Sequence, residues 1–224
     1  MLGDAKPCGV MVGSTLHRFR ANARYCGWDL ETESLNLRFA RPFQVAYCIA
    51  DNKTIETIRS DFIWWPDLEM SEDAAHITRF NPGTYKLAAR PAAEILEEFD
   101  AVIYDPSVET VFQNGLNYDV YIHQNWRRLC GKPVDFSYII RSIDLTTLTK
   151  ALRKGWQPDI SSPEAFLAWQ YKAATYHEKG LKSNLEFCGK EEKIEHDYGE
   201  LHEAANDVVL MMKVYWKRLY QLEF

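Results

Sequence analysis

The chain has 224 residues, of which 46% are hydrophobic and 13% aromatic, enough to build one globular domain with a substantial core. Its formal net charge of −6 argues against a simple basic nucleic-acid-binding protein. No apolar run approaches the roughly 20 residues of a membrane-spanning helix. The opening residues also lack the extended apolar region of a secretory signal.

Five cysteines are scattered along the chain without a Cys-x-x-Cys pair. An odd number at irregular spacing favours reduced thiols over a disulfide framework. We therefore expect a cytoplasmic protein with no membrane association.

Residues 1–23 show little periodicity and are predicted to form an N-terminal arm, so the folded domain is expected over residues 24–224. Strands are predicted where β-branched and aromatic residues are frequent and apolar residues alternate with polar ones. The predicted strands are 25–31, 42–51, 54–65, 101–104 and 110–113.

Helices are predicted where apolar residues recur with the helical period or follow a capping residue. The predicted helices are 74–80, 90–99, 119–131, 143–152, 162–178, 183–188 and 202–222. Asn81-Pro82-Gly83 is expected to close the first of them. Early strands followed by alternating strands and helices indicate an α/β fold.

Charge is segregated along the second half of the chain. Residues 127–154 include seven basic and two acidic side chains, whereas residues 190–207 include seven acidic and two basic ones. A basic surface beside an acidic pocket suits an enzyme that acts on a polyanion through bound metal. Either segment alone is also explained as a solvated face.

Asp29 and Glu31 lie in the first predicted strand. Because successive strand side chains point to opposite faces, the two carboxylates share one face, roughly 6–7 Å apart at Cα. Neighbouring buried carboxylates repel each other, and a hard divalent cation removes that repulsion. An isolated Asp-x-Glu is equally explained by a solvated strand end. The pair indicates a metal site only if further carboxylates join it.

Two later segments supply them. Asn114-Gly115 predicts a turn, which places Asp119 at the start of a helix, where an Asp alone would also serve as a cap. His202 and Asp207 are five residues apart and do not share a face within a helix. If His202 lies just before the helix, it can turn toward Asp207 as a general base; otherwise it is a surface residue or a cap.

Taken in order, these three segments resemble the motifs of the DEDDh 3′→5′ exonucleases, the DnaQ-like family of the ribonuclease H-like superfamily. The segments are Asp29-x-Glu31, Asn114 to Asp119, and His202 to Asp207. Asp119 follows Asp29 by 90 residues and precedes Asp207 by 88, which is compatible with that family. The resemblance extends over residues 25–220.

The chain departs from the family pattern at two places. Ser34 stands where the first motif often has Gly, and Tyr118 stands where the second often has Phe. The sequence of the second motif is similar to that in the exonuclease domains of family B polymerases. His202 in the third motif nevertheless favours the DEDDh class. These departures bear on substrate preference more than on the metal site.

The resemblance implies a ribonuclease H-like α/β fold with a mixed, mainly five-stranded sheet flanked by helices. It also implies that two Mg²⁺ or Mn²⁺ ions are held by four carboxylates, with a histidine as general base. The implied metal ligands are Asp29, Glu31, Asp119 and Asp207, and together with His202 they form the implied catalytic set.

Residues that contact substrate are expected around this set. Those implied to grip the terminal nucleotide are Thr32, Ser34, Leu35 and Asn117. Basic side chains that are candidates for phosphate contacts are Arg127, Arg128, Lys150 and Arg153.

The expected function is metal-dependent 3′→5′ hydrolysis of nucleic acid to nucleoside 5′-monophosphates. Single-stranded or frayed DNA is favoured over RNA, and proofreading beside a DNA polymerase is one expected role. The alternatives are an RNA-trimming exoribonuclease, a non-catalytic module that binds nucleic acid or a polymerase, and a ribonuclease H-type endonuclease.

Overall fold

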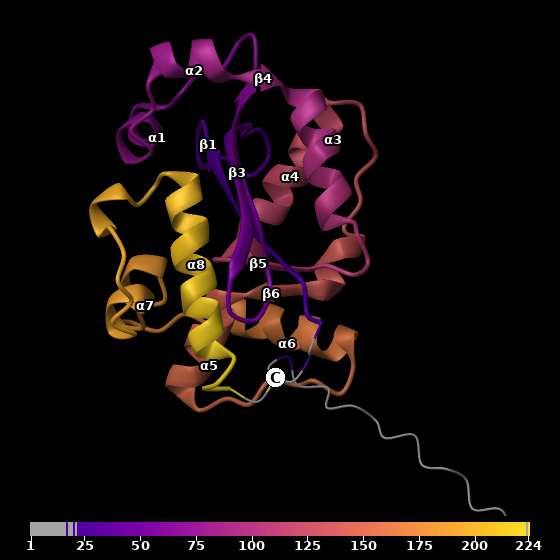
Figure 1. Cartoon of the computed structure of the whole chain (residues 1–224), viewed down its shortest axis with the longest axis vertical. Coiled ribbons are helices and arrows are strands. Elements are labelled where there is room, and N and C mark those ends of the chain that lie inside the picture. The colour runs from indigo at the N-terminus through magenta and orange to yellow at the C-terminus, as the bar shows by residue number, and fades with distance from the viewer. Residues whose placement is uncertain (1–16, 18–19, 21, 223) are drawn as a thin grey trace, which may run out of the picture.

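The computed structural model describes residues 17, 20, 22–222 and 224. A mixed sheet with the strand order β4-β3-β2-β1-β5-β6 forms its centre (Figure 1). Strand β2 pairs antiparallel with both β1 and β3. The pairs β1–β5, β5–β6 and β3–β4 are parallel. The strands are β1 Tyr25–Thr32, β2 Pro42–Ala50, β3 Ile55–Trp64, β4 Arg90–Pro91, β5 Glu109–Phe112 and β6 Ser142–Asp144.

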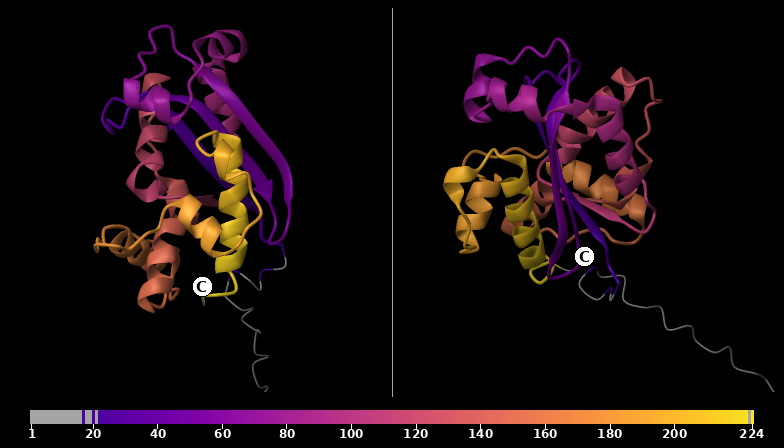
Figure 2. Two further views of the ribbon diagram at one scale, coloured as in Figure 1. Left: turned by 90° about the vertical axis from the view of Figure 1, so that its left-hand side faces the viewer. Right: turned by 45° about the horizontal axis from the view of Figure 1, so that its top comes forward.

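Helices cover both faces of the sheet, so the molecule has three layers (Figures 1 and 2). The C-terminal helix α8 packs on β1 and β2 from one side, and α3 and α4 contact the sheet from the other. The α-helices are α1 Glu72–Ile77, α2 Pro82–Ala88, α3 Ala92–Ile103, α4 Asp119–Leu129, α5 Leu145–Lys154, α6 Pro163–Ala174, α7 Leu185–Glu191 and α8 Ala204–Arg218. Short 3₁₀ turns are η2 Gly115–Asn117, η3 Ser137–Arg141 and η4 Tyr198–Glu200.

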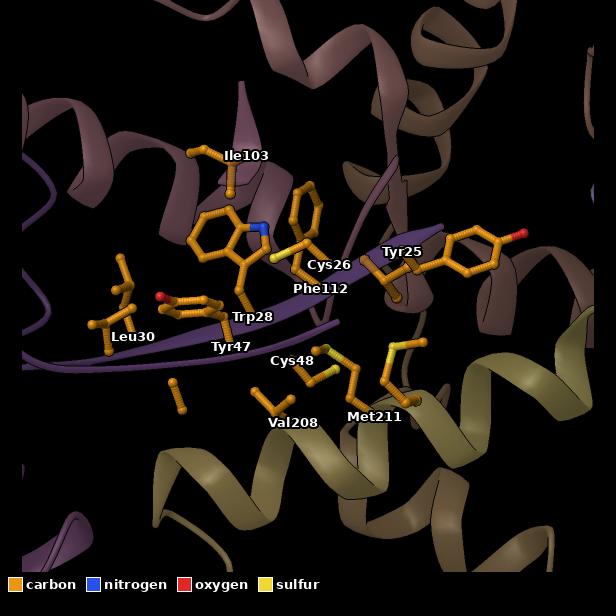
Figure 3. Packing of buried hydrophobic residues seen from close by; sticks show 14 of the residues in the cluster. Tyr25, Cys26, Trp28, Leu30, Tyr47, Cys48, Ile103, Phe112, Val208 and Met211 are labelled. Carbon is orange, nitrogen blue, oxygen red and sulfur yellow. The ribbon is translucent and has the colours of Figure 1, made fainter. Parts of the chain in front are cut away.

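The two faces of β1 pack against different helices. Trp28 points into the layer of α3 and α4, where its ring lies 5.4 Å from Phe99 and 5.5 Å from Phe112 between ring centroids. Figure 3 shows Trp28 on one side of the strand, with Val208 and Met211 of α8 on the other. Because side chains alternate along a strand, Gly27, Asp29 and Glu31 share the side that faces α8.

Gly27 allows α8 to lie close to the sheet. A Cβ atom at this position would lie 2.7 Å from Met212 Sδ and 3.2 Å from Cys48 Sγ. The first of these is shorter than real Cβ contacts, so a larger residue would force the Met212 side chain, and with it the packing of α8, to shift. This close approach brings the N-terminal turn of α8 toward the carboxyl end of β1.

The predicted strands 25–31, 42–51, 54–65 and 110–113 correspond to β1, β2, β3 and β5. The sheet has six strands where mainly five were expected, because the short strands β4 and β6 were not predicted. The prediction of a strand at 101–104 was wrong. Those residues continue α3, whose apolar side chains Phe99 and Ile103 are fully buried at helical spacing.

The segment Asn81-Pro82-Gly83, which was expected to close a helix, begins α2 instead, since α1 already ends at Ile77; α2 was not predicted. The Asn81 side chain accepts hydrogen bonds from the backbone N–H groups of Gly83 and Thr84 at 2.9 and 3.0 Å, and Pro82 occupies the first turn. This is an N-cap arrangement, so the same residues that suggest a turn also start α2.

Most of the predicted N-terminal arm lies outside the described residues. Within the described part, His17 Nδ1 lies 2.9 Å from Glu109 Oε2, and Arg20 also pairs with Glu109. The four described cysteines are free thiols. No helix in the described ranges combines the length and apolar character needed to cross a bilayer.

The close contact at Gly27 predicts that Gly27→Val destabilises the fold by about 1–3 kcal/mol, the usual effect of overpacking a core. Thermal unfolding followed by circular dichroism measures the change. Gly83→Ala is the control, because its Cβ would meet only Asn81 Oδ1 at 3.2 Å. Equal melting temperatures for Gly27→Val and the wild type would contradict the proposed packing.

Candidate metal centre

Acidic side chains from β1 and α8 meet beside the sheet. One carboxylate oxygen each of Glu31 and Asp207 and one ring nitrogen of His202 all lie within 4.8 Å of one another. Glu31 is only 9% exposed, and Asp29, two residues earlier on the same face of β1, is partly buried. The described structure therefore brings the first and third predicted segments together.

Electrostatics add Asp119 to this group. Burial raises the pKa of Asp29 well above its ordinary range, and the negative charges of Glu31, Asp119 and Asp207 raise it further. The pKa of Glu31 is raised to about 9, first by burial and then by Asp207 and Asp119. Burial likewise raises the pKa of Asp119 to about 7 and that of Asp207 to about 6. Asp29 and Asp119 are thus near enough to Glu31 and Asp207 for their charges to interact, while the group within 4.8 Å consists of Glu31, Asp207 and His202.

Asp119 owes its position to the turn between β5 and α4. Asn114 adopts a left-handed conformation with φ of 61°, and at Gly115 any Cβ would overlap the ring of Phe112. The buried carboxylate of Asp144 accepts hydrogen bonds from the N–H groups of Asn114 and Leu116, both at 3.1 Å. These constraints fix the point at which α4 begins, with Asp119 as its first residue.

A second set of contacts ties the start of α4 to the end of β1. The Tyr118 hydroxyl lies 2.6 Å from Thr32 Oγ1 and 2.8 Å from the carbonyl oxygen of Ser34. Thr32 and Tyr118 are neighbours of Glu31 and Asp119 in sequence. Their bonds therefore hold the two acidic segments in register.

His202 lies just before α8, outside the helix that was predicted to begin there. Its backbone N–H points at the Asp207 carboxylate, with both oxygens 3.3 Å away. Its φ of 68° is unusual for a residue with a side chain, and such conformations persist where the surroundings enforce them. The imidazole is exposed at the edge of the acidic group.

The donor set fits hard divalent cations. Carboxylate oxygens are the ligands that Mg²⁺ and Mn²⁺ prefer. The raised pKa values mean that the four charges lack a compensating cation among the described side chains around them. A bound divalent ion would remove the free-energy cost of ionising these carboxylates together. Hydrogen bonds within the protein do not remove that cost.

A pocket of about 760 Å³ opens from this centre. Asp29, Asn117, His202 and Asp207 line one part of it, and Lys150 lines another. Thr32, Ser34 and Leu35 do not line the pocket. Leu35 is 82% exposed, and Ser34 is partly buried beside Tyr118.

The predicted phosphate contacts have different surroundings. Arg127 is 7% exposed and forms an ion pair with Asp100, so the structure speaks against a substrate contact there. Arg128 is exposed on α4 and donates to Asn125, whose amide in turn donates to the carbonyl oxygen of Leu37 at 2.7 Å. A phosphate contact of Arg128 would therefore lie at the surface, near the loop that follows β1.

Sequence reasoning missed Glu203. Its charge raises the pKa of Asp29, Glu31 and Asp207, while its carboxylate accepts hydrogen bonds from Gln44 at 3.2 Å and from the Asn206 N–H at 3.1 Å. The acidic composition of residues 190–207 was the available signal. It could not single out Glu203, because capping α8 and facing the centre are both tertiary features.

No protein-family model matches the chain, and no curated protein matches it. Solved structures do. E. coli exonuclease I in complex with a dA16 oligonucleotide superposes with a TM-score of 0.70 at 16% identity, covering 89% of this chain and 41% of that chain. The zinc-bound form of the E. coli exonuclease I–ssDNA complex gives a TM-score of 0.69, 16% identity and coverages of 88% and 42%.

A moderately thermophilic exonuclease I from Methylocaldum szegediense gives a TM-score of 0.63 at 17% identity, covering 88% of this chain and 40% of that chain. The chain thus spans about two fifths of the length of the structures that it matches. Identity this low shows the fold alone. The predicted ribonuclease H-like α/β fold is confirmed.

The raised carboxyl pKa values predict that metal-free stability falls as pH rises. Because the folded protein holds protons that the unfolded chain releases, stability is fully present below the ordinary carboxyl pKa of about 4 and is lost as pH rises toward about 9. Mn²⁺ or Mg²⁺ should therefore raise the melting temperature more at about pH 8 than at about pH 5.5.

Differential scanning fluorimetry with and without metal measures this shift. Asp29→Asn should lose most of the metal-dependent shift, whereas Asp159→Asn, on an exposed turn with Ser161, should retain it. A shift that is independent of pH, or larger at the acidic value, would show that these carboxylates do not form a metal site.

Proposed function

We propose that the protein is a metal-dependent 3′→5′ exonuclease that releases nucleoside 5′-monophosphates from single-stranded or frayed DNA. The observation that carries this proposal is that Glu31, Asp207 and His202 lie within 4.8 Å of one another, with Asp29 and Asp119 near enough for their charges to act on the same group. Phosphodiester hydrolysis needs charge stabilisation on phosphate oxygens and a base for the attacking water, and this set offers ligands for the first and a candidate for the second.

Bound Mg²⁺ or Mn²⁺ would supply Lewis-acid stabilisation of the reacting phosphate and a lower pKa for water. The four carboxylates would hold the ions, with Asp29 and Glu31 contributed by the sheet, Asp119 by α4 and Asp207 by α8. His202 would take the proton of the attacking water. Its exposed ring and its position before α8, beside Asp207, leave it free to approach a bound strand.

DNA is favoured as the substrate by the neighbouring structures of E. coli exonuclease I, which are complexes with ssDNA and with a dA16 oligonucleotide. Thr32, Ser34, Leu35 and Asn117 are proposed to contact the terminal nucleotide. Tyr118 holds Thr32 and Ser34 in place, and Asn117 lines the pocket beside Asp29. The proposal concerns the hydrolysis itself and includes neither proofreading nor a polymerase partner.

A non-catalytic module with the same fold is less well supported. Keeping four carboxylates in one desolvated site is unfavourable for stability. A module that only bound nucleic acid would gain nothing from them, since negative charge repels phosphate.

Asp119→Asn is predicted to abolish mononucleotide release while the fold is retained, because Asn keeps the shape but removes a ligand charge. The assay offers 5′-labelled single-stranded DNA, mismatched-primer DNA and short RNA with Mg²⁺, and compares the products on gels. Asp159→Asn is the matched control. Full activity of Asp119→Asn, or internal fragments instead of a ladder from the 3′ end, would refute the proposal.

His202→Ala is predicted to lower kcat at neutral pH by about 10²–10⁴-fold, the usual effect of losing a general base. The pH–rate profile of the variant should differ from that of the wild type, because the proposed general base is missing. His76→Ala, on the exposed side of α1, is the control. An unchanged pH–rate profile would remove His202 from the mechanism.

A further inference from the structure

The pocket beside the carboxylates extends beyond the residues needed for hydrolysis. From Asp29 and Asp207 it continues along α5 to the segment that joins α6 and α7. Lys150 and Ala174 line this extension, as does Ser183. Because Thr32, Ser34 and Leu35 lie outside the pocket, the extension overlaps the residues proposed to contact the terminal nucleotide at Asn117 alone.

Lys150 is a buried cation without a counterion. It is 6% exposed, and its Nζ donates one hydrogen bond, to the carbonyl oxygen of Ala174 at 2.7 Å. Among the described residues no carboxylate lies within ion-pair distance of Nζ. Burial accordingly lowers the pKa of Lys150, although Asp144 attracts its charge from farther away. An ammonium group has three donors, so two remain for a ligand.

The neighbouring cations on α5 differ from Lys150. Arg153 pairs with Glu191 at 2.6 Å and lies over the ring of Phe187, while Lys154 pairs with Glu178. Neither lines the pocket. Of these three cations, the buried one alone faces the cavity that adjoins the carboxylates. Burying an unpaired charge is unfavourable, so its position is best explained by an anion that binds there.

The rest of the extension suits a nucleotide. Neutral hydrogen-bonding side chains line it, and the segment after α6 adds two exposed basic side chains together with Glu178, whose charge is paired with Lys154. The neutral ones are Gln113, Asn114, Asn117, Thr146 and Asn184, and the basic ones are His177 and Lys179. Gln113 Nε2 also donates to Thr146 Oγ1 at 2.7 Å and to the carbonyl oxygen of Ser183 at 2.6 Å, which fixes the segment against β5.

We propose that Lys150 binds the phosphate that precedes the scissile phosphate, so that the pocket holds the second nucleotide from the 3′ end. This inference rests on the proposed exonuclease function and specifies its substrate. A polynucleotide with at least two successive phosphates would engage both the carboxylates and Lys150. A mononucleotide ester or an unphosphorylated dinucleotide would reach the carboxylates alone.

The test removes the two partners separately and together. Substrates are octamers of DNA or RNA, whichever the wild type degrades faster, with either natural linkages or one neutral methylphosphonate at the second linkage from the 3′ end. Wild type, Lys150→Met and Lys150→Arg are compared by kcat/KM for release of the first nucleotide. Lys154→Met is the matched control on α5, and a methylphosphonate at the fifth linkage is the control for the substrate.

We expect the methylphosphonate and Lys150→Met each to lower kcat/KM by about 10-fold or more, as for loss of a charge-assisted hydrogen bond. Together they should lower it no further than either one does alone, because they remove the same contact. Lys150→Arg keeps a positive charge and should retain sensitivity to the methylphosphonate. Lys154→Met should leave both kcat/KM and that sensitivity unchanged.

Effects that multiply would overturn the assignment of Lys150 while leaving the exonuclease function standing. The same conclusion follows if Lys150→Met acts on natural octamers like the wild type. A wild-type protein that releases no nucleotide from either octamer with Mg²⁺ or Mn²⁺ would instead refute the proposed function, and the inference with it.

Discussion

Repulsion among four carboxylates is the constraint around which the described structure is arranged. Asp29 and Glu31 come from the central strand, Asp119 from the start of α4 and Asp207 from the first turn of α8. Burial raises the pKa values of all four, and repulsion by the neighbouring site carboxylates raises those of Asp29 and Glu31 further. The fold tolerates this through rigid anchoring, with Gly27 admitting α8 and Asp144 fixing the turn before α4.

The anchoring contacts are themselves mostly neutral. Tyr118 joins Thr32 and Ser34 by short hydrogen bonds, and Trp28 fills the opposite face of β1 with an aromatic cluster. Neutral contacts do not add to the charge of the site. Repulsion among the carboxylates at one face of β1 is therefore opposed by apolar packing at the other face. The negative charge itself would have to be balanced by a bound cation.

Much of this arrangement could be predicted from the sequence, because motif residues keep their order and spacing. The longer strands also follow from alternating apolar residues. Other features depend on tertiary contacts that a sequence pattern does not contain. Strand β6 is only three residues long. Residues 101–103 belong to helix α3, in which Ile103 is buried. Arg127 forms an ion pair with Asp100. Charge alone did not distinguish that arginine from Lys150.

The position of α8 has a consequence for synthesis of the protein. This helix covers Gly27 and carries Asp207, yet it is the last helix of the described chain. Domains form from the N-terminus as the chain leaves the ribosome, so β1 and α4 are made long before α8. A nascent chain would hold three of the four carboxylates without the fourth and without His202. The proposed hydrolysis would therefore require translation through α8.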